Sequence, residues 1–151
     1  MNSNYRLTAE IIQLSNSRTW DEAKIEWALD EIYETDEPET CLCGHFPIIE
    51  ICILKNRING NGATVGNCCV KKFIGLPSDK IFQAVKRIRK DGSKSLNAEA
   101  LAHARGKGWI NDWEHRFYLD IMRKRILTSA QARKKAEVNE KMLRLMQRSR
   151  P

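Results

Sequence analysis

The feature that most constrains this chain is a cluster of cysteines in its first half. Cys41, Cys43, Cys68 and Cys69 lie within 29 consecutive residues, together with His45, one of three histidines. Cysteines and histidines grouped in this way usually share a metal ion, and Zn²⁺ takes four sulfur and nitrogen ligands without redox chemistry. The sequence therefore predicts a zinc-binding module over residues 41–76 with Zn²⁺ as its cofactor.

The pattern between the cysteines predicts a β-hairpin. Ile49, Ile51 and Ile53 alternate along residues 47–55 and are expected to share one face of a strand. The string Asn59-Gly60-Asn61-Gly62 is a dense turn signal, and residues 63–65 are expected to return as a second strand. A cysteine turn, a hairpin and then cysteines at a helix start form the layout of a treble-clef finger.

The expected ligands are Cys41, Cys43 and Cys69, with His45 as the fourth and Cys68 as its alternative. A single residue separates Cys41 from Cys43, which is shorter than the usual spacing and leaves the set open. A three-ligand site with a bound water is the other arrangement. A closed structural site is favoured, because no general acid or base lies nearby in the sequence.

Residues 40–76 resemble a zinc-finger-like family of bacteria and their phages. The resemblance rests on Cys-x-Cys-Gly, an isoleucine-rich strand followed by Lys55-Asn56, a glycine-containing turn, and Val65-Gly66-x-x-Cys69-Val70-x-x-Phe73. A weaker similarity lies in Leu127-Thr128-x-x-Gln131. The family tolerates other residues at the position of Cys68, which supports Cys69 as the ligand. The resemblance implies a zinc site and a phage or mobile-element setting, but no reaction.

Helices are expected on both sides of this module, which gives an α+β, mainly helical fold. An acidic helical element over residues 1–40 is expected to contain a helix near Thr8–Leu14 and another that starts at a capping box at Thr19 and ends before Pro38. Residues 77–151 are expected to form a basic helical region, in one compact unit with the zinc module. Its helices are predicted over 78–90, 96–105, from 111 or 112, and from a capping box at Thr128 towards residue 148.

The charge of the chain changes sign near the first cysteine. Residues 1–40 carry 3 basic and 10 acidic side chains, whereas residues 41–151 carry 23 basic and 9 acidic ones. A strongly basic body attracts polyanions, so the sequence predicts sequence-independent contacts with nucleic-acid phosphates. The expected contacts are Lys71, Lys72, Lys86, Arg87, Arg89, Lys90, Arg123, Lys124, Arg125, Arg133, Lys134 and Lys135.

The competing interpretation is a zinc-stabilised module that binds a protein, for instance a phage product that binds a host factor. Its acidic N-terminal helices would supply the contact surface, with Trp20 and Trp27 as anchors if they are not in the core.

No transmembrane segment, signal peptide or catalytic motif is recognisable, so a cytoplasmic protein without enzymatic activity is expected. His103 and His115 lie in predicted helices without a partner that would form a catalytic pair. Cys52, between isoleucines, is interpreted as a buried apolar side chain.

Overall fold

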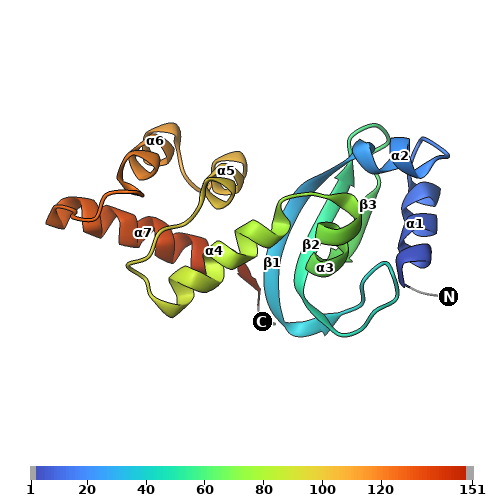
Figure 1. Cartoon of the computed structure of the whole chain (residues 1–151), viewed down its shortest axis with the longest axis horizontal. Helices are drawn as coiled ribbons and strands as arrows, with labels where there is room; N and C mark the ends of the chain where they lie inside the picture. Colours follow the sequence, from blue (N-terminus) through green and yellow to red (C-terminus); the bar gives the residue numbers. More distant parts are fainter. Residues whose placement is uncertain (1–2, 149–151) are drawn as a thin grey trace. The chain divides into compact units, whose positions relative to one another are not determined.

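The computed structural model describes residues 3–148 and shows an α+β protein, as expected from the sequence (Figure 1). Its chain divides into two compact units. The first comprises the residues up to Asp79 together with the C-terminal residues from Gln147, and the second comprises Lys80–Met146. The division therefore falls in the first turn of helix α4, Ser78–Lys90, and not at the boundary near residue 40 that the sequence suggested.

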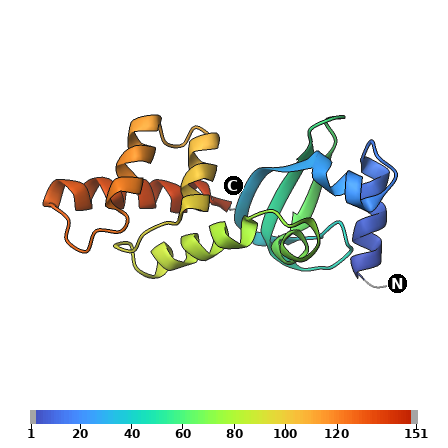
Figure 2. The same cartoon turned by 45° about the horizontal axis from the view of Figure 1, so that its top comes forward.

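The first unit is built on a sheet of strand order β3-β2-β1-β4 (Figures 1 and 2). Strands β1 (Trp27–Glu39), β2 (Ile48–Asn56) and β3 (Gly62–Gly66) are antiparallel neighbours, and β4 (Gln147–Arg148) adds a short parallel pairing to β1. The helices of this unit are α1 (Ser3–Leu14), α2 (Trp20–Ala23) with the 3₁₀ turn Lys24–Glu26, and α3 (Asn67–Cys69) with the π-helical turn Val70–Ile74.

The predicted hairpin between β2 and β3 is confirmed. Asn56 closes its turn, because its Oδ1 accepts hydrogen bonds from the amides of Ile58 (2.8 Å) and Asn59 (3.1 Å). The predicted apolar face is wrong in detail, because Ile49 is exposed and Ile53 is only half-buried, whereas Cys52 and Leu54 are fully buried. The strand is covered in part on both faces, so alternation alone does not identify its core side.

The largest departure from the prediction is Trp27–Glu39, which is a strand and not a helix. Its apolar residues recur at helical spacing because a β-bulge between Leu29 and Glu31 interrupts the alternation of the strand. Pairing on both sides, with β2 and β4, overrides the local helical pattern. Pro38 lies in the part of β1 where the register with β2 is irregular. This position suits proline, which has no amide hydrogen to donate to the ladder. The acidic side chains of residues 30–39 thus belong to the sheet.

The helical start predicted at Thr19 gives only the four residues of α2, and Thr19 makes no side-chain capping bond. Trp27 is buried, and its Nε1 donates to Ser15 Oγ at 2.8 Å, while Trp20 is half-buried. Trp27 is therefore a core residue and is not available as an interface anchor.

The second unit contains the rest of α4 and three further helices: α5 (Ala98–Gly106), α6 (Asp112–Ile121) and α7 (Ser129–Leu145). The capping box predicted at Thr128 is confirmed, and Asn111 forms another at the start of α6. Helix α7 ends earlier than predicted, because Gln147 and Arg148 pair with β1. None of the helices within residues 3–148 has the length and apolar character needed to cross a membrane.

A polar network holds the helices of the second unit together. Tyr118 Oη on α6 donates to Asn139 Oδ1 on α7 at 2.6 Å and accepts from the amide of Leu96 at 2.9 Å. Asn139 Nδ2 donates to the carbonyl oxygens of Gly92 and Lys94. Because both side chains are buried, their polar atoms need these partners inside the protein.

In the first unit, Glu26 joins the N-terminal helices to the hairpin. Its carboxylate is 4% exposed and accepts hydrogen bonds from the amides of Asn16 and Ser17 and from Asn56 Nδ2, at 2.8, 2.8 and 2.9 Å. The bond from Asn56, followed by those from the two amides, lowers the pKa of Glu26 to about 2 against the opposing effect of burial. The charged form of Glu26 is thus the one that the fold stabilises.

We expect Glu26→Gln to lower the free energy of unfolding most at neutral pH. A carboxyl group whose folded pKa of about 2 lies below its ordinary 4.5 stabilises the fold above pH 4.5 and loses that contribution as pH falls towards 2. The urea midpoints of wild type and variant, measured from pH 7 to pH 2.5, should therefore converge in acid. The exposed Glu22→Gln is the control and should follow the wild type. A difference that is independent of pH would contradict this prediction.

Candidate metal centre

Cys41 and Cys43 lie in a tight turn that follows β1. The amide of Cys41 donates to the carbonyl oxygen of His45 at 2.9 Å, and the amide of Gly44 donates to the carbonyl oxygen of Cys41 at 2.8 Å. Gly44 has φ of +93°, a left-handed conformation that glycine adopts without strain. The turn is attached to the sheet, because the amide of Leu42 donates to Thr64 O on β3 at 2.9 Å.

Cys69 reaches the same place from helix α3, directly after β3. The ligand atoms of Cys41, Cys43 and Cys69 all lie within 4.8 Å of one another. These residues are 3%, 4% and 9% exposed, and the structure shows them as free thiols. The three cysteines that the sequence selected as first ligands are thus brought together.

Backbone amides point at two of the sulfur atoms. The amide of Gly66 donates to Cys41 Sγ at 3.3 Å, and the amide of His45 donates to Cys43 Sγ at 3.4 Å. Such N–H···S bonds stabilise thiolates, which are the form of cysteine that binds metal ions. The amides of Gly66 and His45 are therefore in position to stabilise Cys41 and Cys43 as thiolates.

The three thiols also interact electrostatically. The hydrogen bond from Cys69, helped by the amide of Gly66, lowers the pKa of Cys41 to about 5, although burial acts in the opposite direction. The same bond and burial raise the pKa of Cys69. Cys41 is thus the thiol of this pair that ionises more readily. Cys52 stays a neutral thiol, because burial raises its pKa to about 12.

The structure places the two candidate fourth ligands differently from these three. His45 and Cys68 are both exposed, and neither belongs to the group of close ligand atoms. His45 nevertheless contributes its amide and carbonyl to the cysteine turn. Cys68 directly precedes Cys69 in α3, but its side chain does not share the burial of Cys69.

Arg6 is a neighbour of this site that the sequence gave no signal for. A Cβ atom built on Gly44 would lie 2.5 Å from Arg6 Nη1, so the guanidinium of α1 rests against the cysteine turn. The other end of α1 contacts the hairpin, where Leu14 O accepts from Asn59 Nδ2 and Asn61 Nδ2. Helix α1 thus supports the module at both ends.

Most basic residues predicted to contact phosphates lie at the surface, but two do not. Lys135 is buried, and its Nζ donates to Ser93 O at 2.9 Å. Lys134 is half-buried and pairs with Glu114 (3.0 Å) and Glu137 (3.4 Å). The other predicted contacts are exposed: Lys71, Lys72, Lys86, Arg87, Arg89, Lys90, Arg123, Lys124, Arg125 and Arg133.

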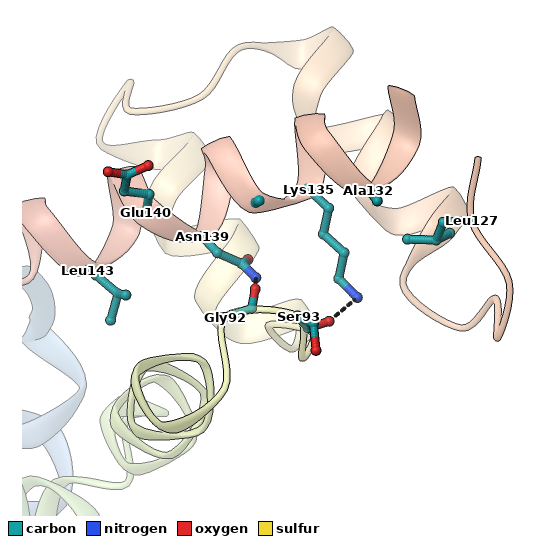
Figure 3. A pocket seen from close by; sticks show the side chains of 9 residues that line it. Gly92, Ser93, Leu127, Ala132, Lys135, Asn139, Glu140 and Leu143 are labelled. Carbon is teal, nitrogen blue, oxygen red and sulfur yellow. Dashed lines mark hydrogen bonds between the residues drawn. The ribbon is translucent and has the colours of Figure 1, made fainter. Parts of the chain in front are cut away.

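An open hollow of about 340 Å³ lies between α7 and the loop that follows α4 (Figure 3). Leu127, Ala132 and Leu143 give it an apolar lining. Its polar residues Lys135 and Asn139 turn to the loop, where Figure 3 shows their bonds to Ser93 and Gly92. These two side chains therefore hold the loop in place.

The two histidines of the second unit do not belong to the group of close ligand atoms. His103 packs edge-on against Trp109 with ring centroids 5.3 Å apart, and burial lowers its pKa to about 4. His115 is half-buried in α6. Within the described residues, the group formed by Cys41, Cys43 and Cys69 is the set of close ligand atoms that suits a metal ion.

No protein-family model, characterised protein or solved structure matches this chain. The resemblance to a zinc-finger-like family stays a prediction from the sequence.

We expect Gly44→Ala to destabilise the first unit more than Gly60→Ala. Both glycines have positive φ, at +93° and +80°, so alanine costs about 1–2 kcal/mol of backbone strain at either position. Only at Gly44 would the new methyl group also displace Arg6, since nothing lies within 4 Å of a Cβ at Gly60. Urea unfolding of the two variants measures the difference. Equal losses would show that the contact between Arg6 and the turn contributes nothing.

Proposed function

We propose that this protein binds one Zn²⁺ through Cys41, Cys43 and Cys69, and that the ion has a structural role. The observation that supports the proposal most directly is the meeting of three buried thiols within 4.8 Å, with two amides donating to their sulfur atoms. Zinc bound at about 2.3 Å from each sulfur would bring the sulfurs to about 3.8 Å of one another. Small rotations of the three cysteine side chains would bring the sulfurs to this spacing.

His45 is the proposed fourth ligand, and Cys68 is the alternative. His45 belongs to the same turn as Cys41 and Cys43, and its amide donates to Cys43 Sγ, whereas Cys68 directly precedes the ligand Cys69 in α3. A closed tetrahedral site of this kind joins the end of β1 to the end of β3. The ion would thus stabilise the module and take no part in catalysis.

Protein purified without added metal should contain one zinc per chain. Cys69→Ser should abolish zinc retention and lower the unfolding midpoint, because a structural ion contributes directly to folding. Cys68→Ser is the matched control, since it alters the adjacent but exposed cysteine and should retain zinc. Zinc content by elemental analysis measures both. A folded wild-type protein without metal, or loss of zinc only in Cys68→Ser, would contradict the proposal.

Cobalt substitution tests the fourth ligand separately. The thiolate-to-cobalt charge-transfer band scales with the number of sulfur ligands, so three thiolates are expected in the wild type and in Cys68→Ser. His45→Ala should change the ligand-field bands and weaken metal retention. Four thiolates in the wild type would assign the position to Cys68.

The second part of the proposal is contact with nucleic acid through the basic helical unit. Residues 80–146 carry 17 basic and 7 acidic side chains, a net charge of +10. Arg123, Lys124 and Arg125 are exposed in the segment between α6 and α7. A concentration of this kind attracts phosphates irrespective of base sequence, which gives the protein an accessory, non-catalytic role.

Binding to DNA or RNA should weaken steeply as salt rises, since each neutralised phosphate releases counterions. Reversing Arg123 and Arg125 to Glu should make the negative slope of log K against log salt shallower by about 2 for duplex DNA, because each lost phosphate contact removes about 0.9 from it. The matched control reverses Arg18 and Lys55, which are also exposed but lie in the acidic first unit. Equal losses of affinity from the two double variants would show that net charge alone, and not the segment 123–125, determines the binding.

A protein partner is the other candidate use of the module. Of the two anchors that this interpretation names, Trp27 is buried in a strand, and Trp20 is half-buried in α2. Absence of nucleic-acid binding, together with one stoichiometric protein partner, would favour it.

A further inference from the structure

Helix α6 carries an aromatic pair whose first ring is open to solvent. Trp113 is 56% exposed, although its spacing by four places it on one helix face with Phe117 and the buried Ile121. Its ring is stacked on that of Phe117, with centroids 5.2 Å apart and planes inclined by 10°. Phe117 covers one face of the indole, and the exposed part comes from the ring edge and the other face, above which Lys134 Nζ lies 5.9 Å from the ring centroid.

The surroundings hold this ring in place. Lys134 Nζ lies 5.9 Å from the ring centroid and is itself paired with Glu114 at 3.0 Å. Glu114 also accepts the amide of Asn111 in the capping box that begins α6. Because Phe117 already packs against one face of Trp113, a flat ligand that stacks on the other face would immobilise little additional side-chain motion.

The charge around the ring is suited to a phosphate backbone. Asp112 and Glu114 are neutralised by Arg105 and Lys134, which leaves Asp120 as the remaining acid of α6. Arg116 is exposed and lies one helical turn from Trp113, on the same side. The exposed segment 123–125 follows at the end of the same helix.

We propose that Trp113 stacks on an unpaired base, so that the second unit prefers single-stranded nucleic acid to duplex. This inference rests on the proposed contact with nucleic acid and names its substrate class. An exposed aromatic ring among cationic side chains is the combination that single-strand-binding proteins use, because every base presents a flat face. A duplex hides those faces within its own stacks, so Trp113 adds nothing to duplex binding.

The test compares full-length protein on fluorescein-labelled oligo(dT), oligo(U) and a duplex, all of the same length. Trp113→Ala should weaken single-strand binding roughly 5- to 100-fold, as expected for the loss of one stacked base. Duplex binding should stay unchanged, and Trp113→Phe should restore most of the single-strand affinity. Ile126→Ala is the control, since it truncates another apolar side chain of the same unit, 88% exposed, and should alter neither affinity.

The outcomes distinguish the stacking role of Trp113 from the proposed contact with nucleic acid on which it rests. Salt-dependent binding that Trp113→Ala leaves intact, or weakens equally on single strands and duplex, overturns the stacking role alone. No binding to any of the three probes overturns both. Circular dichroism melting of each variant shows whether a loss follows from unfolding, and with Trp113→Phe folded and active the stacking role stands even if Trp113→Ala unfolds.

Discussion

The meeting of Cys41, Cys43 and Cys69 is the constraint on which the first unit depends. These side chains join the turn after β1 to the helix after β3, and the β2–β3 hairpin lies between them in the chain. Closing a loop of this length costs conformational entropy, which a contact between its two ends helps to offset. The amides of Gly66 and His45 point at the sulfurs, so the backbone of the loop is already shaped around the group.

Local signals were sufficient for the parts of the fold that depend on local chemistry. Helix α4 and the start of α7 match their predictions, because caps and apolar spacing act within a few residues. The hairpin is also correct, since Asn56 and the glycine-rich turn that follows close it without help from distant residues. The three cysteines were predicted from the clustering of cysteines within 29 residues, and the family resemblance favoured Cys69 over Cys68.

The errors arose where distant residues decide the outcome. Strand β1 resembles an amphipathic helix in sequence, and only pairing with β2 and β4 makes it a strand. The exposure of His45 follows from the turn geometry, and the approach of Arg6 to Gly44 follows from the packing of α1. Trp113, Phe117 and Ile121 share one helix face by their spacing, yet only Ile121 is fully buried. The spacing of apolar residues shows which of them share a helix face, but not how much of that face neighbouring elements cover.

The triplet Arg133-Lys134-Lys135 shows why counting charges overstates a phosphate-binding surface. Arg133 is exposed, Lys134 is paired with Glu114 and Glu137, and Lys135 donates to the carbonyl oxygen of Ser93. To bind a phosphate, Lys134 would have to exchange partners that already neutralise it, and Lys135 would have to release the loop at Ser93. Three adjacent cations thus offer one phosphate contact without structural cost. The segment 123–125, whose side chains are all exposed, offers three, so in the proposed contact with nucleic acid the segment between α6 and α7 would contribute more than the face of α7.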